Sequence, residues 1–269
     1  MRGQPGWVLL TNDDGVDAPG LVPFAAALAD VAPTRIVVPD RERSWVGKAI
    51  TRLEPVRVSM LQRHGFQVHA VSGYPADCVQ LGVHTVFDAP PLLVVSGINI
   101  GYNHGSAFLQ SSGTVGAALE ASIAGVAAIA FSTGSTQPWG PWKAWVESPA
   151  SRSTWERLAG IAANMTAALL THPDPELLLS INLPDDADMA TERRLTSIAA
   201  IGYDRLFRED SPGVFVHDFG GGVRYRDTLA GTDIEAALDG AISITPLRSA
   251  HAVAPAPGLA GLLGAGEKP

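Results

Sequence analysis

The chain has 269 residues, of which 46% are hydrophobic and 17% are charged, a balance that supplies a core and excludes a disordered chain. Its 19 Lys and Arg against 27 Asp and Glu give a net charge of −8, which disfavours binding to duplex nucleic acid. An anionic substrate would therefore be small, and a metal ion or backbone N–H groups would have to neutralise it. At this length we expect one large domain.

The sequence also limits the compartment in which the protein works. Its single cysteine, Cys78, cannot form an internal disulfide, and we expect it to be a buried apolar residue of a helix. Residues 1–7 lack the basic and apolar regions of a secretory signal. The most apolar stretch, residues 121–131, is too short to span a bilayer. We therefore expect a cytoplasmic protein without a membrane segment.

Hydrophobic runs in the first half alternate between strand and helix signals. We predict strands at 7–11, 35–39, 92–95 and 126–131, a hairpin at 55–60 and 66–71, helices at 21–31, 75–86 and 113–123, and a Gly- and Asn-rich loop at 96–111. The strands are apolar throughout rather than alternating. This pattern predicts an α/β fold with a mostly parallel sheet covered by helices on both faces, in which ligands bind beyond the carboxyl ends of the strands.

The second half departs from this alternation. Residues 133–153 contain three prolines and three tryptophans and are predicted to form an irregular insertion or lid. A helix at 155–170 and a strand at 177–183 follow, and 195–225 is rich in strand signals. We assign 1–190 to the catalytic core and 191–249 to a β-rich arm and closing segment of the same domain, with the arm serving self-association. We expect 250–269, rich in Ala, Pro and Gly, to be a flexible tail.

Two adjacent carboxylates, Asp13 and Asp14, follow the first strand. They repel each other unless a cation lies beside them, and oxygen ligands of this kind suit Mg²⁺ or Mn²⁺. Ser44 and Asn99 follow two other strands and could supply neutral oxygens at the same sheet edge. The alternatives are that one Asp caps the next helix, that Ser44 is a loop hydroxyl and that Asn99 forms a turn.

Ser112-Gly113-Thr114 begins a predicted helix and could hold phosphate oxygens with its free N–H groups and hydroxyls. The alternative is an ordinary serine cap followed by a glycine that allows close packing. Metal and anion candidates on neighbouring loops are the equipment of a phosphomonoesterase. Among the histidines, only His104, in the Asn99 loop, is well placed to assist. Dinucleotide-binding and P-loop patterns do not occur in the sequence.

Six ordered motifs make the sequence similar to a known family. They are Thr11 to Gly15 with Ala18 to Gly20, Pro39 to Ser44, Pro75 to Val79, Val95 to Asn99, Ser112 to Val115, and Gly231 to Asp233 with Ser243 to Leu247. With them the chain resembles the SurE family of survival-protein nucleotidases, which are divalent-metal-dependent phosphatases acting on nucleoside monophosphates. The resemblance covers most of the chain.

The resemblance implies a Rossmann-like three-layer fold with a swapped C-terminal hairpin in a homodimer or homotetramer. It implies one Mg²⁺ or Mn²⁺ per subunit, held by Asp13, Asp14, Ser44 and Asn99. It also implies phosphate contacts from Asn103, Ser112, Gly113 and Thr114. We expect water to attack phosphorus, with Asp13 or Asp14 as the base. The sequence does not distinguish between the two carboxylates.

The loop after Ser44 departs from the family's usual Gly and small polar residues, because it continues with Trp45 and, three residues later, Lys48. Both, like His104, are candidates for substrate contact, although Lys48 could equally point to solvent. This departure keeps two other hypotheses open. One is a phosphatase redirected to another small phosphorylated metabolite, and the other is a nucleotide-binding protein that does not turn over.

Overall fold

The computed structural model describes residues 6–171, 174, 176–220 and 222–249, so the predicted tail at 250–269 lies outside the described residues. Within them, the largest sheet has nine strands in the order β3-β4-β2-β1-β5-β6-β7-β13-β8. The six strands from β4 to β7 run parallel, whereas β3 and β13 are antiparallel to their neighbours β4 and β7. The predicted α/β class with a mostly parallel sheet is confirmed.

The strands of this sheet are β1 (Val8–Thr11), β2 (Thr34–Pro39), β3 (Val58–Arg63), β4 (Phe66–Val71), β5 (Leu93–Ile100), β6 (Ala127–Gly134), β7 (Leu178–Pro184), β8 (Arg193–Leu195) and β13 (Ile242–Pro246). The helices are α1 (Leu21–Ala29), α2 (Pro75–His84), α3 (Gly105–Ser111), α4 (Gly113–Ile123), α5 (Trp139–Val146), α6 (Arg152–Leu170) and α7 (Asp233–Leu238), with a 3-10 turn at Pro149–Ser151. None of the helices in these described ranges is both long enough and apolar enough to cross a bilayer.

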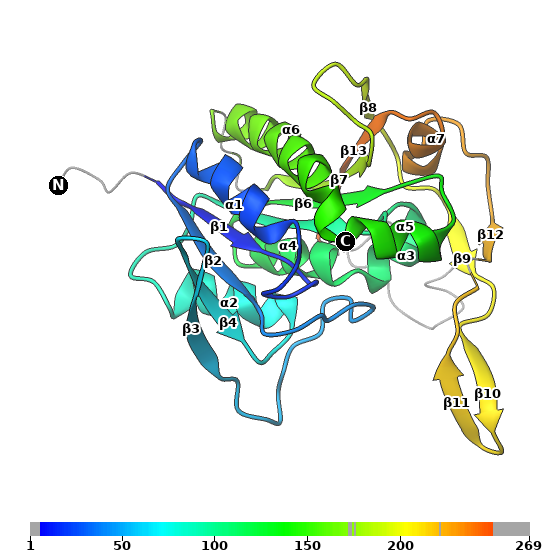
Figure 1. The fold of residues 1–269 in the computed structure, drawn as a ribbon, viewed down its shortest axis with the longest axis horizontal. Coiled ribbons are helices and arrows are strands. Elements are labelled where there is room, and N and C mark those ends of the chain that lie inside the picture. The colour runs from blue at the N-terminus through cyan, green and yellow to red at the C-terminus, as the bar shows by residue number, and fades with distance from the viewer. Residues whose placement is uncertain (1–5, 172–173, 175, 221, 250–269) are drawn as a thin grey trace, which may run out of the picture.

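Helices cover both faces of the central strands, which gives three layers (Figure 1). On one face α1 packs against α6, and Phe24 and Trp155 are buried there in one apolar cluster. On the other face α2 packs against α4, where Val79 and Val115 belong to a second cluster. The strands between these clusters are buried on both sides, which explains why their sequences are apolar throughout. Cys78 is buried in the second cluster, as predicted.

Two segments predicted to lack regular structure are ordered. The predicted loop at 96–111 instead continues β5 to Ile100 and then forms α3, and the predicted irregular insertion at 133–153 contains α5. Pro138 lies at the cap of α5, Pro141 lies in its first turn and Pro149 begins the 3-10 turn, so that none of the three removes an N–H that a helical bond needs. The Trp142 side chain is buried, and its indole nitrogen donates to Asp185 at 2.8 Å. An amphipathic helix therefore forms where the prolines suggested none.

The β-rich arm contains two short two-stranded sheets, one of β9 (Ile201–Tyr203) with β12 (Val223–Tyr225) and one of β10 (Phe207–Ser211) with β11 (Val214–His217). The β10–β11 hairpin projects away from the body of the protein (Figure 1). It carries the exposed apolar side chains Phe207, Val214 and Phe215. Such side chains suit contact with another surface. Self-association through the arm stays a prediction.

Candidate functional site

A cavity of about 670 Å³ lies beyond the carboxyl ends of β1, β2 and β5, the edge at which the sequence predicts the site. It is lined by the loops after these strands, by helices α3 and α5 and by the arm at His217, Phe219 and Gly220. Its lining includes Asp13, Asp14, Glu42, Ser44, Trp45, Asn99, Tyr102, Asn103, His104, Phe108, Ser112, Trp139, Lys143, His217 and Phe219. Most of the candidates from the sequence are therefore brought together.

The loop after β1 fixes Asp13 from several directions. Asn12 closes the loop by donating to the Gly15 carbonyl at 3.0 Å and accepting from the Gly15 N–H at 3.1 Å. The Arg43 N–H donates to the Asp13 carbonyl at 2.7 Å, which joins this loop to the one after β2. The Thr114 hydroxyl donates to the Asp13 carboxylate. Asp13 is only 3% exposed, so its position is set before any ligand binds.

The pKa values of both carboxyls reflect this crowding. Burial raises the pKa of Asp13 to about 6, although the hydrogen bonds from Thr114 lower it. Burial also raises the pKa of Asp14 well above its usual range, and the neighbouring charge of Asp13 raises it further. The N–H of Ile100 donates to Asp14 at 3.2 Å, which opposes the shift only in part. A cation beside this pair would favour the charged form of both groups.

Ser44 and Asn99 present neutral oxygen atoms to the same cavity. The Ser44 hydroxyl donates to the Glu42 carboxylate at 2.7 Å, which directs its proton away and leaves lone pairs on the oxygen. The Asn99 amide nitrogen donates to the Gly101 carbonyl at 2.7 Å, so its carbonyl oxygen is the atom that could face a cation. Both side chains therefore keep an oxygen atom with free lone pairs at the cavity.

An irregularity in β5 positions Asn99. The register with β6 shifts between Ser96 and Asn99, as at a β-bulge, which turns the strand end toward the cavity. Gly97 lies in this shift with φ +123°, a conformation that residues with a side chain rarely adopt. A Cβ atom there would lie 2.2 Å from the carbonyl oxygen of Phe131. The site thus depends on a glycine that bears no functional group.

The three residues Ser112, Gly113 and Thr114 at the start of α4 have different positions and roles. Ser112 lines the cavity and caps the helix, since its hydroxyl accepts from the Val115 N–H at 3.1 Å. Gly113 and Thr114 are absent from the cavity lining and instead serve Asp13. A Cβ on Gly113 would lie 2.8 Å from the Cβ of Asp13, so the glycine allows the helix to approach. Only Ser112 of the three faces the cavity directly.

Asn103 and His104 follow β5 and also line the cavity. Asn103 is held by its N–H, which donates to Asn182 at 2.9 Å, and by its amide nitrogen, which donates to Ser132 at 2.7 Å. The His104 ring stacks on Tyr102 with 4.9 Å between ring centroids. Burial lowers the pKa of His104, so its imidazole is neutral near pH 7 and brings no positive charge to the cavity.

The lysine at the cavity is not the one that the sequence suggested. Lys48, a candidate for phosphate contact, forms an ion pair with the buried Glu120 of α4 and is not part of the cavity lining. Lys143 of α5 lines the cavity instead, with its Nζ 3.9 Å from Glu42 and 3.4 Å from Glu147. Sequence analysis missed Lys143 because it interpreted this segment as irregular.

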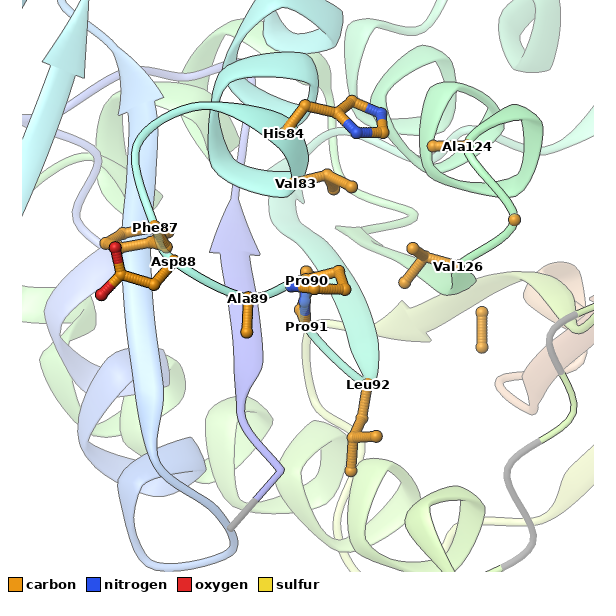
Figure 2. A pocket seen from close by; sticks show the side chains of 12 residues that line it. Val83, His84, Phe87, Asp88, Ala89, Pro90, Pro91, Leu92, Ala124 and Val126 are labelled. Atoms are coloured by element: carbon orange, nitrogen blue, oxygen red, sulfur yellow. The ribbon is translucent and has the colours of Figure 1, made fainter. Parts of the chain in front are cut away.

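A second cavity, of about 580 Å³, lies at the opposite edge of the sheet, before β5 and β6 begin. Its lining is mostly apolar and includes Pro90, Pro91 and Leu92 (Figure 2). Among the described residues that line it, His84 and Asp88 are the only titratable ones. This cavity lacks the paired carboxylates and hydroxyls of the first, so we place the chemistry in the first.

Comparison with known proteins finds relatives that match most of the chain. The profile described as "Survival protein SurE" matches residues 8–205. A curated protein named "5'-nucleotidase SurE" from Geobacter sulfurreducens is 38% identical over 244 residues, which are 89% of this chain and 87% of that protein. One of the same name from Methanopyrus kandleri is 37% identical, with 89% and 90% covered. The crystal structure of the SurE protein from Aquifex aeolicus is similar with a TM-score of 0.68 and 30% identity, covering 90% of this chain and 93% of that one.

Proposed function

The chain belongs to the SurE family, and we propose from that premise that its main cavity hydrolyses nucleoside monophosphates to nucleosides and inorganic phosphate. It is thus a phosphoric monoester hydrolase of the 5'-nucleotidase type. The observation that carries the proposal is the carboxylate pair of the buried Asp13 and the half-buried Asp14, which line one cavity together with Ser44 and Asn99. Relatives of this length and identity are named for the same activity.

The donor set fits a divalent cation. Two carboxylates, one hydroxyl and one amide carbonyl are hard oxygen donors, which favour Mg²⁺ or Mn²⁺ over softer metals. The raised pKa values of Asp13 and Asp14 support this fit, since hydrogen bonds and the charge of Lys143 stabilise the two carboxylates only in part. We propose one such ion per subunit, which when bound would supply Lewis-acid stabilisation of the phosphoryl oxygens.

The remaining residues would bind and orient the phosphate. Ser112 and Asn103 offer a hydroxyl and an amide, and Lys143 offers the positive charge that the neutral His104 does not. Asp13 or Asp14 would accept the proton of the attacking water, because both are carboxylates fixed at the cavity wall. Gly113 and Thr114 act indirectly through Asp13. Lys48 is not assigned a role in this reaction.

The direct test is release of inorganic phosphate. Nucleoside 5'- and 3'-monophosphates and a set of sugar phosphates are incubated with the protein and Mg²⁺, Mn²⁺ or EDTA. We expect release from nucleotides with either metal and none in EDTA. Release confined to a phosphoester that is not a nucleotide would favour the redirected phosphatase. Nucleotide binding without release under any of these conditions would favour the protein without turnover.

Replacing Lys143 and Lys48 in turn tests whether only Lys143 contacts the substrate. Lys143→Ala should lower kcat/KM for a nucleotide about tenfold, because a charge-assisted contact to phosphate is lost. Lys48→Met should instead lower the free energy of unfolding, since the buried Glu120 keeps the hydrogen bond from Gln80 but loses its cationic partner. Steady-state kinetics and urea denaturation of both variants check this. If Lys48→Met lowered kcat/KM and Lys143→Ala did not, the assignment of phosphate contact to Lys143 would be contradicted.

We also propose that the protein forms a homodimer or homotetramer through the arm. The exposed apolar side chains of the β10–β11 hairpin support this, because they lack an apolar cover in the single chain. These exposed side chains are absent from the cavity lining, so this proposal can fail without affecting the proposed reaction.

A further inference from the structure

Five aromatic rings form a cluster at the main cavity. They belong to Trp45, Phe108, Tyr203, His217 and Phe219, which we call the aromatic wall. Trp45 is its centre, with ring centroids 4.8 Å from His217, 5.3 Å from Tyr203, 5.4 Å from Phe219 and 6.1 Å from Phe108. All of these except Tyr203 line the cavity.

The wall is assembled from distant parts of the chain. Trp45 comes from the loop after β2, Phe108 from α3, and the other three from the arm. Tyr203 is fixed from behind because its hydroxyl donates to the Ala107 carbonyl at 2.6 Å. Phe219 lies 5.6 Å from Phe108 between ring centroids, which ties the arm to the core at this point. The arm is therefore part of the substrate cavity.

Trp45 adopts an unfavourable backbone conformation to reach this position. Its φ is +61°, which is uncommon for a residue with a bulky side chain and costs free energy that other contacts must offset. The ring nevertheless remains 40% exposed after packing against four others. A strained, half-covered indole on a cavity wall is poorly explained by core packing alone, and it suits contact with a ligand.

The lining of the cavity combines two kinds of side chain. The charged side chains of its lining are Asp13, Asp14, Glu42 and Lys143, whereas the arm contributes only His217, Phe219 and Gly220. A polyhydroxylated sugar would find few hydrogen-bonding partners against the aromatic wall. A flat heterocycle could stack on the wall, while the charged residues of the same cavity suit the phosphate of the substrate.

We propose that the aromatic wall, with Trp45 as its main contact, binds the base of the substrate by stacking and selects nucleotides over phosphomonoesters without a base. This inference rests on the proposed function, and it assigns the discrimination between substrates to Trp45 and to the arm residues packed on it. Stacking of a base on one aromatic side chain is typically worth about tenfold to a hundredfold in affinity.

The test compares adenosine 5'-monophosphate with ribose 5-phosphate, which lacks the base. In Trp45→Gly, whose glycine accepts a positive φ, the ratio of the two kcat/KM values should fall at least about tenfold. Trp45→Phe should keep most of the ratio. Phe215→Ala, an exposed aromatic residue of the same arm outside the cavity lining, is the matched control and should not change it. An unchanged ratio in Trp45→Gly would overturn the proposal.

A binding measurement makes the test independent of turnover. Adenosine, which has no phosphate, is titrated into the protein in EDTA by calorimetry. We expect at least about tenfold weaker binding by Trp45→Gly and by Phe219→Ala than by the parent chain. Equal affinity in all three would overturn the aromatic wall. Absence of phosphate release from every substrate would instead overturn the proposed function, while the adenosine titration still decides this inference.

Discussion

Asp13→Asn should lower phosphate release from nucleotides about a thousandfold or more. The substitution removes one of the two charges that would hold the divalent ion, and loss of that ion removes several kcal/mol of transition-state stabilisation. The amide keeps the size of the side chain and can still accept from the Thr114 hydroxyl, so the loop after β1 should remain in place. Phosphate release at saturating Mn²⁺ checks the rate.

The same substitution should stabilise the protein when no metal is present. The pKa of Asp13 in the folded protein is about 6, above its usual value of 3.8, so the folded state binds the proton more tightly than the unfolded state. At low pH, where Asp13 is protonated in both states, this group therefore carries no penalty. As the pH rises to about 6, its ionisation progressively lowers the free energy of unfolding. At pH 7.5 the penalty is complete, and it amounts to up to about 3 kcal/mol.

Urea denaturation in EDTA tests whether the ionised Asp13 destabilises the metal-free protein. Asp13→Asn should be more stable than the parent chain at pH 7.5, and the difference should shrink at pH 5. Asp17→Asn serves as the control on the same loop, because Asp17 is exposed and pairs only with Arg63 at 3.0 Å in the described structure. A parent chain more stable than Asp13→Asn at pH 7.5 in EDTA would show that the buried charge is compensated within the protein.

The sequence alone predicts that the acidic pair, Ser44 and Asn99 lie close together, because these residues follow strands, and all four line one cavity. Asp13, Ser44 and Asn99 come after β1, after β2 and at the end of β5, and parallel strands bring their carboxyl ends to one edge. Buried strands have a strong signal, since they are apolar on both faces. The neighbourhood of these three residues was therefore predictable without knowledge of any side-chain contact.

The roles of the two lysines were not predictable in the same way. Lys48 lies four residues after Ser44, but the intervening Gly47 packs against α4, where a Cβ on Gly116 would lie 2.3 Å from the Gly47 carbonyl oxygen. This approach leads the chain along α4 and brings Lys48 to Glu120, one turn further on. Only the packing of a loop on a helix reveals this, and such contacts leave no periodic pattern.

The aromatic wall depends on contacts between residues that lie still farther apart in the sequence. Phe108 lies in a helix where the sequence predicted a loop, and His217 and Phe219 lie in an arm that was assigned to self-association. Nothing in the spacing of these residues links them to Trp45. The part of the site set by strand ends was thus accessible from the sequence, whereas the part set by tertiary contacts was not.

Gly97→Ala, which adds one methyl group to β5 near the cavity, should strongly lower the free energy of unfolding. Its Cβ would lie 2.2 Å from the Phe131 carbonyl oxygen and 3.2 Å from the Asn99 nitrogen, and its φ of +123° disfavours any side chain. Backbone strain and overpacking each cost about 1–3 kcal/mol, so we expect a loss of about 4 kcal/mol in the free energy of unfolding. That is a large part of the stability of a typical domain.

Gly65→Ala is the matched control for Gly97→Ala. Gly65 also has a positive φ, +91°, but nothing lies within 4 Å of the position that its Cβ would occupy, so only the conformational cost of about 1 kcal/mol applies. Urea denaturation of both variants isolates the clash with Phe131. The folded fraction of Gly97→Ala should also lose phosphatase activity, because relief of the clash moves Asn99. Equal destabilisation by the two alanines would mean that β5 and β6 can separate at this point without cost, and that Asn99 is not held by the close approach of Gly97 to Phe131.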